Sequence, residues 1–200
     1  GVPRYTHSEL LDKDEIGVAT GMAWTAAGGE LLPIEVSILP GKGNLLLTGQ
    51  LGDVMKESAQ MSLSYIRSIW DKLGLEKDFY EKIDVHIHAP EGAVPKDGPS
   101  AGVTLVTAMV SALMKRAVRR DIAMTGEMTL RGKVLPIGGL KEKSLAAYRA
   151  GSREIIIPID NKKDMEEIPA EIREEMTIHL ADNITEVLDW ALAAEGSEQK

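Results

Sequence analysis

The chain has 200 residues, 44% of them hydrophobic, which suffices for one well-buried domain. Its formal net charge of −8 leaves no excess of cations to neutralise phosphates, so we do not expect nucleic acid as a partner of this domain. The absence of cysteine excludes disulfides, thiolate metal sites and a cysteine nucleophile, and no apolar run approaches the roughly 18 residues of a membrane span, so we expect no membrane partner.

The N-terminal part is predicted to be a linker followed by strands. Residues 1–14 are polar and aperiodic, which suggests an extension joined to something upstream. Residues 16–24 and 31–39 are rich in apolar and β-branched residues on either side of two glycines, which predicts a hairpin, and a Gly/Pro turn leads to a third strand at 44–48. We interpret Trp24 as a core or partly buried residue, or alternatively as part of the lining of a substrate groove.

The clearest helix is predicted at residues 48–74, where apolar residues recur at helical spacing. Thr48 or Asp53 is expected to cap its start, and Gly74 follows its end.

Residues 83–89 alternate strictly and are predicted to form a strand with Asp84, His86 and His88 on one face. Two histidines with one carboxylate make a weak metal site, so we interpret this face as solvated or as an edge of the functional site.

The stretch PKDGPSAG at residues 95–102 passes from a Gly/Pro-rich loop into a nearly all-apolar helix that ends at Met114. Ser100 is therefore predicted at the positive end of a buried helix, where an oxyanion can be stabilised. The alternative is that Ser100 only caps the helix.

A second candidate catalytic residue lies on a helix predicted at residues 140–150. At 100° per residue, Lys143 falls on a face of small and apolar residues, whereas Lys141 is placed less well. The alternative for Lys143 is a solvated charge with its stem along the surface.

The remaining segments alternate between strands and helices, which predicts a mixed α/β fold in one compact domain over residues 15–194, with a frayed tail at 195–200. We expect a short strand at 121–126 and a hairpin of 127–130 with 133–137. A central strand is expected at 154–159, charged helices at 161–168 and 170–175, and a strand at 176–180. Asp182 or Asn183 is expected to cap a last helix.

Serine and lysine together can act as nucleophile and base, because a neutral amine can accept the proton of a hydroxyl. Lysine normally titrates near 10.4, and desolvation by apolar neighbours lowers its pKa in the required direction. Asp97 near Lys143 would raise that pKa, so two roles stay open for it: orientation or gating between active and inactive forms, and direct help in catalysis. Thr125 offers a neutral hydroxyl that could orient the amine.

Three motifs together resemble the proteolytic domain of the Lon family of ATP-dependent proteases: PKDGPSAG at 95–102, TGEMTLRG at 125–132 and LPIGGLKEK at 135–143. The resemblance implies a peptidase with a Ser-Lys dyad, in which Ser100 is the nucleophile and Lys143 the base. It matches Thr125 to a hydroxyl beside the lysine and Asp97 to an acidic residue before the serine. The N–H groups of Ser100 and Ala101 are our candidates for the oxyanion hole, and His86 is a further supporting candidate.

The resemblance also implies polypeptide substrates, a homohexameric ring, and a location in the cytoplasm or an organelle matrix. No cofactor is expected in this domain, since ATP and Mg²⁺ would serve an ATPase module that this sequence does not contain. Two other classes remain open from the residues: a non-catalytic domain that binds a phosphate or peptide terminus at the loop of residues 95–102, and a metal hydrolase that uses His86 and His88.

Overall fold

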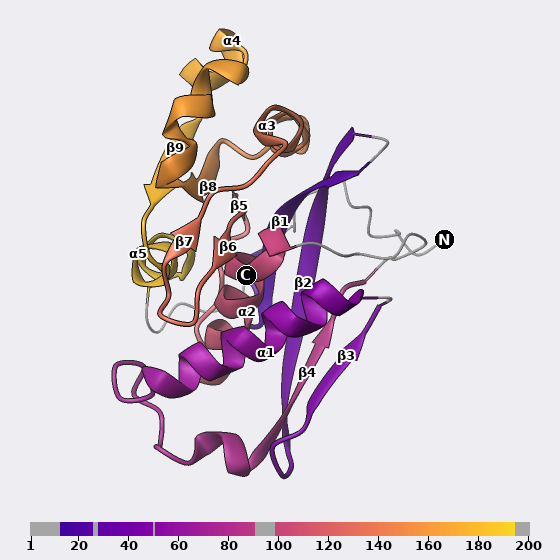
Figure 1. The fold of residues 1–200 in the computed structure, drawn as a ribbon, viewed down its shortest axis with the longest axis vertical. Coiled ribbons are helices and arrows are strands. Elements are labelled where there is room, and N and C mark those ends of the chain that lie inside the picture. The colour runs from indigo at the N-terminus through magenta and orange to yellow at the C-terminus, as the bar shows by residue number, and fades with distance from the viewer. Residues whose placement is uncertain (1–12, 26–27, 50, 91–98, 195–200) are drawn as a thin grey trace.

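The computed structural model describes residues 13–25, 28–49, 51–90 and 99–194 (Figure 1). The strands are β1 (Val18–Thr25), β2 (Gly28–Pro40), β3 (Leu45–Thr48), β4 (Ile83–His88), β5 (Ile122–Met124), β6 (Glu127–Met128), β7 (Val134–Leu135), β8 (Glu154–Pro158) and β9 (Thr177–Ala181). The α-helices are α1 (Asp53–Ser68), α2 (Gly102–Met114), α3 (Leu140–Arg149), α4 (Ala170–Glu175) and α5 (Ile184–Ala191). Shorter 3₁₀ turns are η1 (Phe79–Glu81), η2 (Pro99–Ala101) and η3 (Ile159–Glu167).

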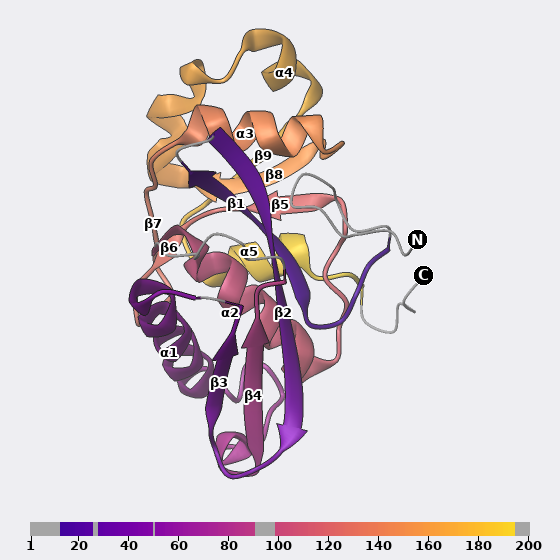
Figure 2. The ribbon, with the colours of Figure 1, turned by 90° about the vertical axis from the view of Figure 1, so that its right-hand side faces the viewer.

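One mixed sheet of seven strands organises the domain, in the order β3-β4-β2-β1-β5-β8-β9 (Figure 2). Strands β1, β5, β8 and β9 run parallel to one another, and β2 pairs antiparallel with β1 on one side and β4 on the other. The small hairpin of β6 and β7 stands apart from this sheet. The mixed α/β class and the single domain predicted from the sequence are confirmed.

Helices cover the two faces of the sheet unequally. Helix α2 packs against β1 and β2, and helices α1 and α5 pack against α2. This side of the sheet holds the larger core. Helix α3 packs on the opposite face of β1 and β2, above a smaller core. Strand β8 is buried on both faces, because Ile156 belongs to the larger core and Ile155 and Ile157 to the smaller one, as expected for a central parallel strand.

The third strand predicted at residues 44–48 is present as β3, but it does not pair with β2 as a Gly/Pro turn between neighbouring strands would suggest. Strand β3 follows the turn after β2 but pairs in parallel with β4, which lies between them. Pairing of β3 with β4 places Thr48 opposite His88 and buries Ile87 in the core. The turn lies where the Gly/Pro pattern predicts it, but the strand that pairs with β3 lies about 40 residues further along the chain.

The long helix also differs from its predicted form. Helix α1 begins at Asp53 after Gly52, which provides no side-chain cap, and it ends at Ser68. Neither Thr48 nor Asp53 is the cap, because the chain is still extended at Thr48, in β3. The final helix fits the sequence better: Asn183 caps α5 in a reciprocal capping box with Glu186.

No helix in the described part of the chain is both long and apolar enough to cross a membrane. The predicted linker at residues 1–14 and tail at 195–200 lie almost wholly outside the described residues.

Candidate active site

Ser100 lies in the 3₁₀ turn η2, just before the buried helix α2, and is partly buried. The residue that caps α2 is Ala101, and no side chain caps this helix. The N–H of Val103, which a capping hydroxyl would satisfy, instead donates to the carbonyl of Gly126 at 3.0 Å. Ser100 therefore does not cap α2, and the capping interpretation of this residue is wrong.

The turn that carries Ser100 is fastened to the segment that follows β5. The N–H of Gly126 donates to the Ser100 carbonyl at 2.9 Å, so two hydrogen bonds join Gly126 to the start of α2. The preceding residue, Thr125, donates its N–H to the carbonyl of Ile156 in β8 at 3.1 Å. The segment of Thr125 and Gly126, which follows β5, is thus hydrogen-bonded both to β8 and to the turn that carries Ser100.

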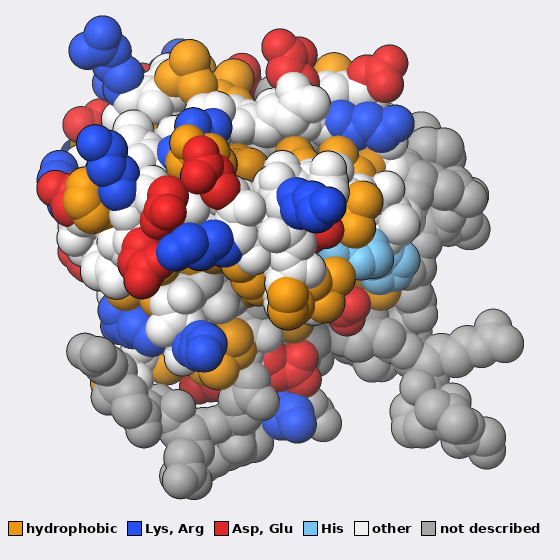
Figure 3. All heavy atoms as spheres, turned by 90° about the horizontal axis from the view of Figure 1, so that it is seen from below, with side chains coloured by type: hydrophobic (Ala, Val, Ile, Leu, Met, Phe, Trp, Pro, Cys, Tyr) orange, Lys and Arg blue, Asp and Glu red, His pale blue; other side chains and the backbone are white. Residues whose placement is uncertain are grey.

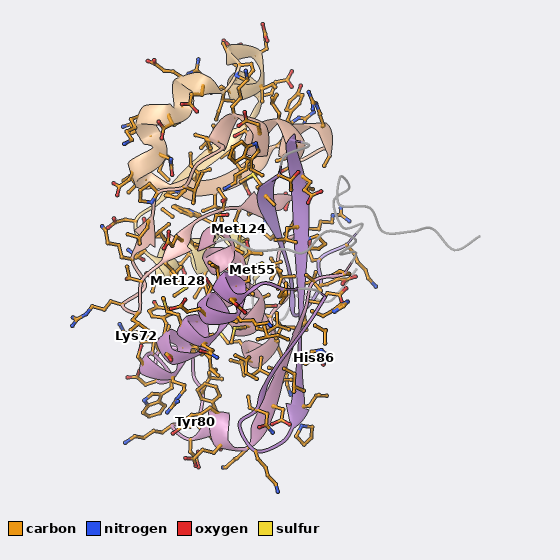
Figure 4. All side chains as sticks on the ribbon, turned by 45° about the vertical axis from the view of Figure 1, so that its right-hand side comes forward. Met55, Lys72, Tyr80, His86, Met124 and Met128 are labelled. Carbon is orange, nitrogen blue, oxygen red and sulfur yellow. The ribbon has the colours of Figure 1, made fainter. Side chains whose placement is uncertain are left out.

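Gly126 is required for this arrangement. A Cβ at this position would lie 2.9 Å from a methyl group of Val103 and 3.0 Å from one of Val134. In the surrounding core Met55, Met124 and Met128 lie together at the centre of the molecule (Figure 4). Close packing here fixes the position of the residues on either side of Gly126.

Lys143 reaches the same place from α3, on the other side of the sheet. Its side chain is on the buried face of α3 with Leu140 and Ala147, and only 3% of Lys143 is exposed. Its Nζ donates a hydrogen bond to Thr125 Oγ1 at 3.2 Å, and Thr125 is itself buried. Lys141 is exposed, so the helical-face prediction that favoured Lys143 is confirmed.

Burial lowers the pKa of the Lys143 amine from its ordinary value of 10.5 to about 8. The cause is desolvation, which penalises the charged form. Within the described residues, no carboxylate forms an ion pair with Lys143 that would restore the pKa. A base with a pKa near 8 is partly neutral at physiological pH and can accept a proton.

The helix that carries Lys143 is positioned by two residues whose roles the sequence did not suggest. A Cβ at Gly29 would lie 2.0 Å from the carbonyl oxygen of Glu142, so glycine in β2 lets α3 approach the sheet closely. Buried Asn161 accepts from the N–H of Ile137 and donates to its carbonyl, both at 2.9 Å, which fixes the loop before α3. The sequence indicated neither role: the glycine pair that includes Gly29 is typical of a hairpin turn, and nothing in the sequence singles out Asn161.

Trp24 is 61% exposed, so the core interpretation of this residue is wrong. It lies near the end of β1, and a Cβ at Gly139 would come within 3.1 Å of its side chain. Gly139 immediately precedes α3 and has a φ of 72°, so the indole stands beside the helix that carries Lys143. A large exposed aromatic side chain at this point is available to contact a ligand.

His86 lies far from Lys143 in the fold. It lies on β4 opposite Ser37, whereas α3 meets β2 at Gly29, which is eight residues away or roughly 26 Å along an extended strand. Figure 4 shows His86 well separated from Met124, the residue before Thr125. Among the described residues, no three histidine or acidic side chains are grouped so as to hold a metal ion. Asp97 lies outside the described residues, so its predicted role stays a prediction.

Comparisons with known proteins identify the family to which this chain is similar. A family model described as the Lon protease (S16) C-terminal proteolytic domain matches residues 1–194. The chain is 61% identical over 192 residues to Lon protease 1 of Bacillus subtilis, which covers 96% of this chain and 24% of that relative. It is 56% identical over 192 residues to Lon protease of Heliobacterium modesticaldum, with the same coverage. The chain thus spans about a quarter of the length of these curated relatives.

Proposed function

Because the chain belongs to the Lon protease family, a family of serine peptidases, and corresponds to its C-terminal proteolytic domain, we propose that it hydrolyses peptide bonds with Ser100 as nucleophile and Lys143 as base. The observation that carries this proposal is the buried amine of Lys143, with its lowered pKa and its hydrogen bond to Thr125. Gly126, the residue after Thr125, donates its N–H to the Ser100 carbonyl, and this connection between the two segments supports pairing Ser100 with Lys143.

In the first step of the proposed reaction, the neutral amine accepts the proton of the Ser100 hydroxyl while Oγ attacks the carbonyl carbon of the peptide. The ammonium of Lys143 then returns this proton to the departing amine as the C–N bond breaks. Water, deprotonated by the same amine, hydrolyses the acyl ester and regenerates the hydroxyl. Only a lysine that gains and loses its proton near neutral pH can serve in both directions.

Thr125 and the start of α2 supply the remaining interactions. A neutral lysine amine still has N–H groups to donate to Thr125 Oγ1, which leaves its lone pair for the serine hydroxyl. The N–H groups of Ser100 and Ala101 lie at the positive end of α2, where we place the oxyanion of the tetrahedral intermediate. Trp24 is assigned to the substrate groove because its exposed indole stands beside α3.

The wider assignments follow from the family. We propose unfolded polypeptides as substrates, a homohexameric ring as the assembly, and the cytoplasm or an organelle matrix as the location. The proposed hydrolysis uses no cofactor in this domain. ATP and Mg²⁺ are assigned to an ATPase module within the larger part of the relatives that this chain does not span.

Cleavage of a fluorogenic peptide tests the proposal. Ser100→Ala and Lys143→Met should each reduce turnover by about 10³-fold or more, because nucleophile and base act as a unit. Ser37→Ala and Lys141→Met, which alter exposed residues of the same kinds, should retain it. Retained turnover in Ser100→Ala would contradict the proposal.

A covalent label distinguishes catalysis from simple binding at the helix end. An acylating reagent directed at serine should modify Ser100 stoichiometrically in the wild type and much more slowly in Lys143→Met. Equal labelling of the two proteins would show that Lys143 does not activate the hydroxyl.

A further inference from the structure

Strand β2 is longer than its neighbour β1, so part of one edge of β2 has no partner strand. The pairing of the two strands ends with Val18 opposite Glu35, whereas β2 continues to Pro40 (Figure 2). On its other edge β2 pairs with β4 as far as Pro40. Residues 36–40 therefore present roughly 13 Å of strand that β1 does not cover.

The chain turns out of the sheet just before β1, and this leaves the edge open. Gly17 has a φ of 81°, and a Cβ there would collide with the Val36 carbonyl oxygen, so the turn requires glycine. Before the turn, the Glu15 carbonyl accepts from the N–H of Val118 at 2.9 Å. The described residues that precede β1 thus lie beside the segment at Val118 and not along β2.

Ile38 carries the unpaired backbone groups of this edge. The N–H of Val36 points to the β1 side, where it donates to the Gly17 carbonyl at 2.7 Å. Because alternate residues of a strand direct their N–H and C=O groups to the same side, those of Ile38 also point there. Neither group is hydrogen-bonded to any described residue. Pro40, which has no N–H, takes the next position on this side, as is usual at an open edge.

A groove with a volume of about 760 Å³ lies along this edge. Its apolar lining includes Ile16, Ile38, Leu75, Phe79 and Leu113. Figure 3 views the molecule from the end where β2 turns toward β3, and hydrophobic side chains are exposed there beside charged ones. A strand added beside β2 would pair with the backbone of Ile38 and direct every second side chain into the groove.

From the open edge and its groove we infer that the domain binds an extended segment of an unfolded polypeptide as an additional strand beside β2. Unfolded polypeptides offer both features that the site recognises, namely unpaired backbone groups and exposed apolar side chains. A lipid chain would fill the groove but leave the backbone groups of Ile38 unpaired. The choice of an unfolded polypeptide rests on the proposed function, whereas the addition of a strand does not.

Lys115 adds a preference for acidic residues in the bound segment. It lines the groove, is exposed, and forms no ion pair with any residue in the described part of the chain. The other lysine of the groove, Lys82, is already paired with Glu76 at 3.0 Å and with Asp78 at 3.7 Å. The charge of Lys115 is therefore available to a carboxylate near the apolar residue that enters the groove.

This binding site lies apart from the proposed peptidase centre. Helix α2 has 13 residues, so its last turn, which lines the groove, is roughly 20 Å from the Ser100 turn. At about 3.3 Å per residue, a polypeptide anchored at β2 needs about six further residues to reach Ser100. Polypeptides long enough to span both sites should be held more tightly than short peptides.

Fluorescence polarisation with a labelled, capped Asp-Val-Ile-Val-Glu peptide and the Ser100→Ala protein tests the inference. This background prevents cleavage, so binding is measured whether or not Ser100 is the nucleophile. Saturable binding below about 1 mM is expected. Ile38→Pro should weaken it at least about tenfold, because the variant loses the N–H and places a ring at the edge, whereas Ile38→Val should retain it.

A second pair of variants tests the charge. Lys115→Asn should weaken binding about threefold, and Lys141→Asn, which alters an exposed lysine on α3, should not. Lys115 has a φ of 57°, which asparagine adopts readily, so its variant should fold normally. A peptide with lysine in place of both acidic residues should bind more weakly, and N-methylation of the three apolar residues should weaken binding at least about fivefold.

No saturable binding below about 1 mM, unchanged affinity in Ile38→Pro, or equal affinity for the N-methylated peptide would overturn the inference. Equal affinity for the lysine peptide would overturn the role of Lys115. Tighter binding of dodecanoate than of the peptide would assign the groove to a lipid, and dimerisation that Ile38→Pro abolishes would assign the edge to a second copy. Should Ile38→Pro fail to fold, NMR of Ser100→Ala decides, because the peptide must shift the amide signal of Ile38 and slow its exchange with solvent.

Discussion

Replacing Lys143 by methionine should make the domain more stable at neutral pH. The amine is almost fully buried, and its pKa falls from 10.5 to about 8 because burial penalises the charged form. At about 1.4 kcal/mol per tenfold change, this difference corresponds to roughly 3 kcal/mol that opposes folding at pH 7. Methionine removes this penalty but leaves the buried Thr125 hydroxyl without its partner, which costs about 1–2 kcal/mol. The net gain in the free energy of unfolding is then about 1–2 kcal/mol.

The sign of the pH dependence gives a second check on the same variant. Between pH 8 and 10.5 the unfolded chain binds more protons at residue 143 than the folded chain, so wild-type stability gains from this group as pH rises. At pH 10 the penalty on the wild type falls below about 1 kcal/mol, and the advantage of Lys143→Met should vanish.

Urea unfolding of the wild type, Lys143→Met and Lys141→Met at pH 7 and pH 10 measures these differences. The exposed Lys141 is the control, and its variant should stay within about 0.5 kcal/mol of the wild type at both values. A Lys143→Met protein less stable than the wild type at pH 7, or a difference that does not change with pH, would refute the reasoning.

Four further outcomes are expected. Peptide hydrolysis should rise about fivefold from pH 7 to pH 8 and level off above pH 9, because the pKa of Lys143 is near 8; a rise that continues tenfold per pH unit past 9 would contradict this. Thr125→Val should lower turnover about tenfold or more while Thr125→Ser restores most of it, as steady-state kinetics would show. Gly29→Ala should destabilise the fold by at least about 2 kcal/mol and reduce hydrolysis, whereas Gly138→Ala, whose Cβ meets no atom within 4 Å, should do neither. Asn183→Ala should cost about 1 kcal/mol in urea unfolding through loss of the α5 cap, with hydrolysis unchanged.

The parts of the fold that depend on local periodicity were predictable. The alternation over residues 83–89 predicts a strand, which the structure confirms as β4 (Ile83–His88). The spacing of apolar residues correctly places Lys143 rather than Lys141 on the buried face of α3. Each pattern depends only on which side chains of a single strand or helix face the core. A short window of sequence contains that information.

Features that depend on distant segments were not predictable in the same way. The parallel pairing of β3 with β4 and the close approach of α3 to Gly29 join residues far apart in the chain. The exposure of Trp24 follows from its place near the end of β1 beside Gly139, and a tryptophan in an apolar run normally indicates burial. Ser100 was placed near the start of α2, but only the hydrogen bonds of Gly126 show that it does not cap that helix.

The protonation of Lys143 is the claim on which the proposed chemistry depends, and NMR can observe it directly. In protein labelled with ¹³C-lysine, the Cε signal of Lys143 can be assigned by its absence in Lys143→Met and followed from pH 6 to pH 11. The structure predicts a midpoint near pH 8, well below those of the exposed lysines. A midpoint at or above pH 10 would show a permanently charged side chain that cannot act as the base for Ser100.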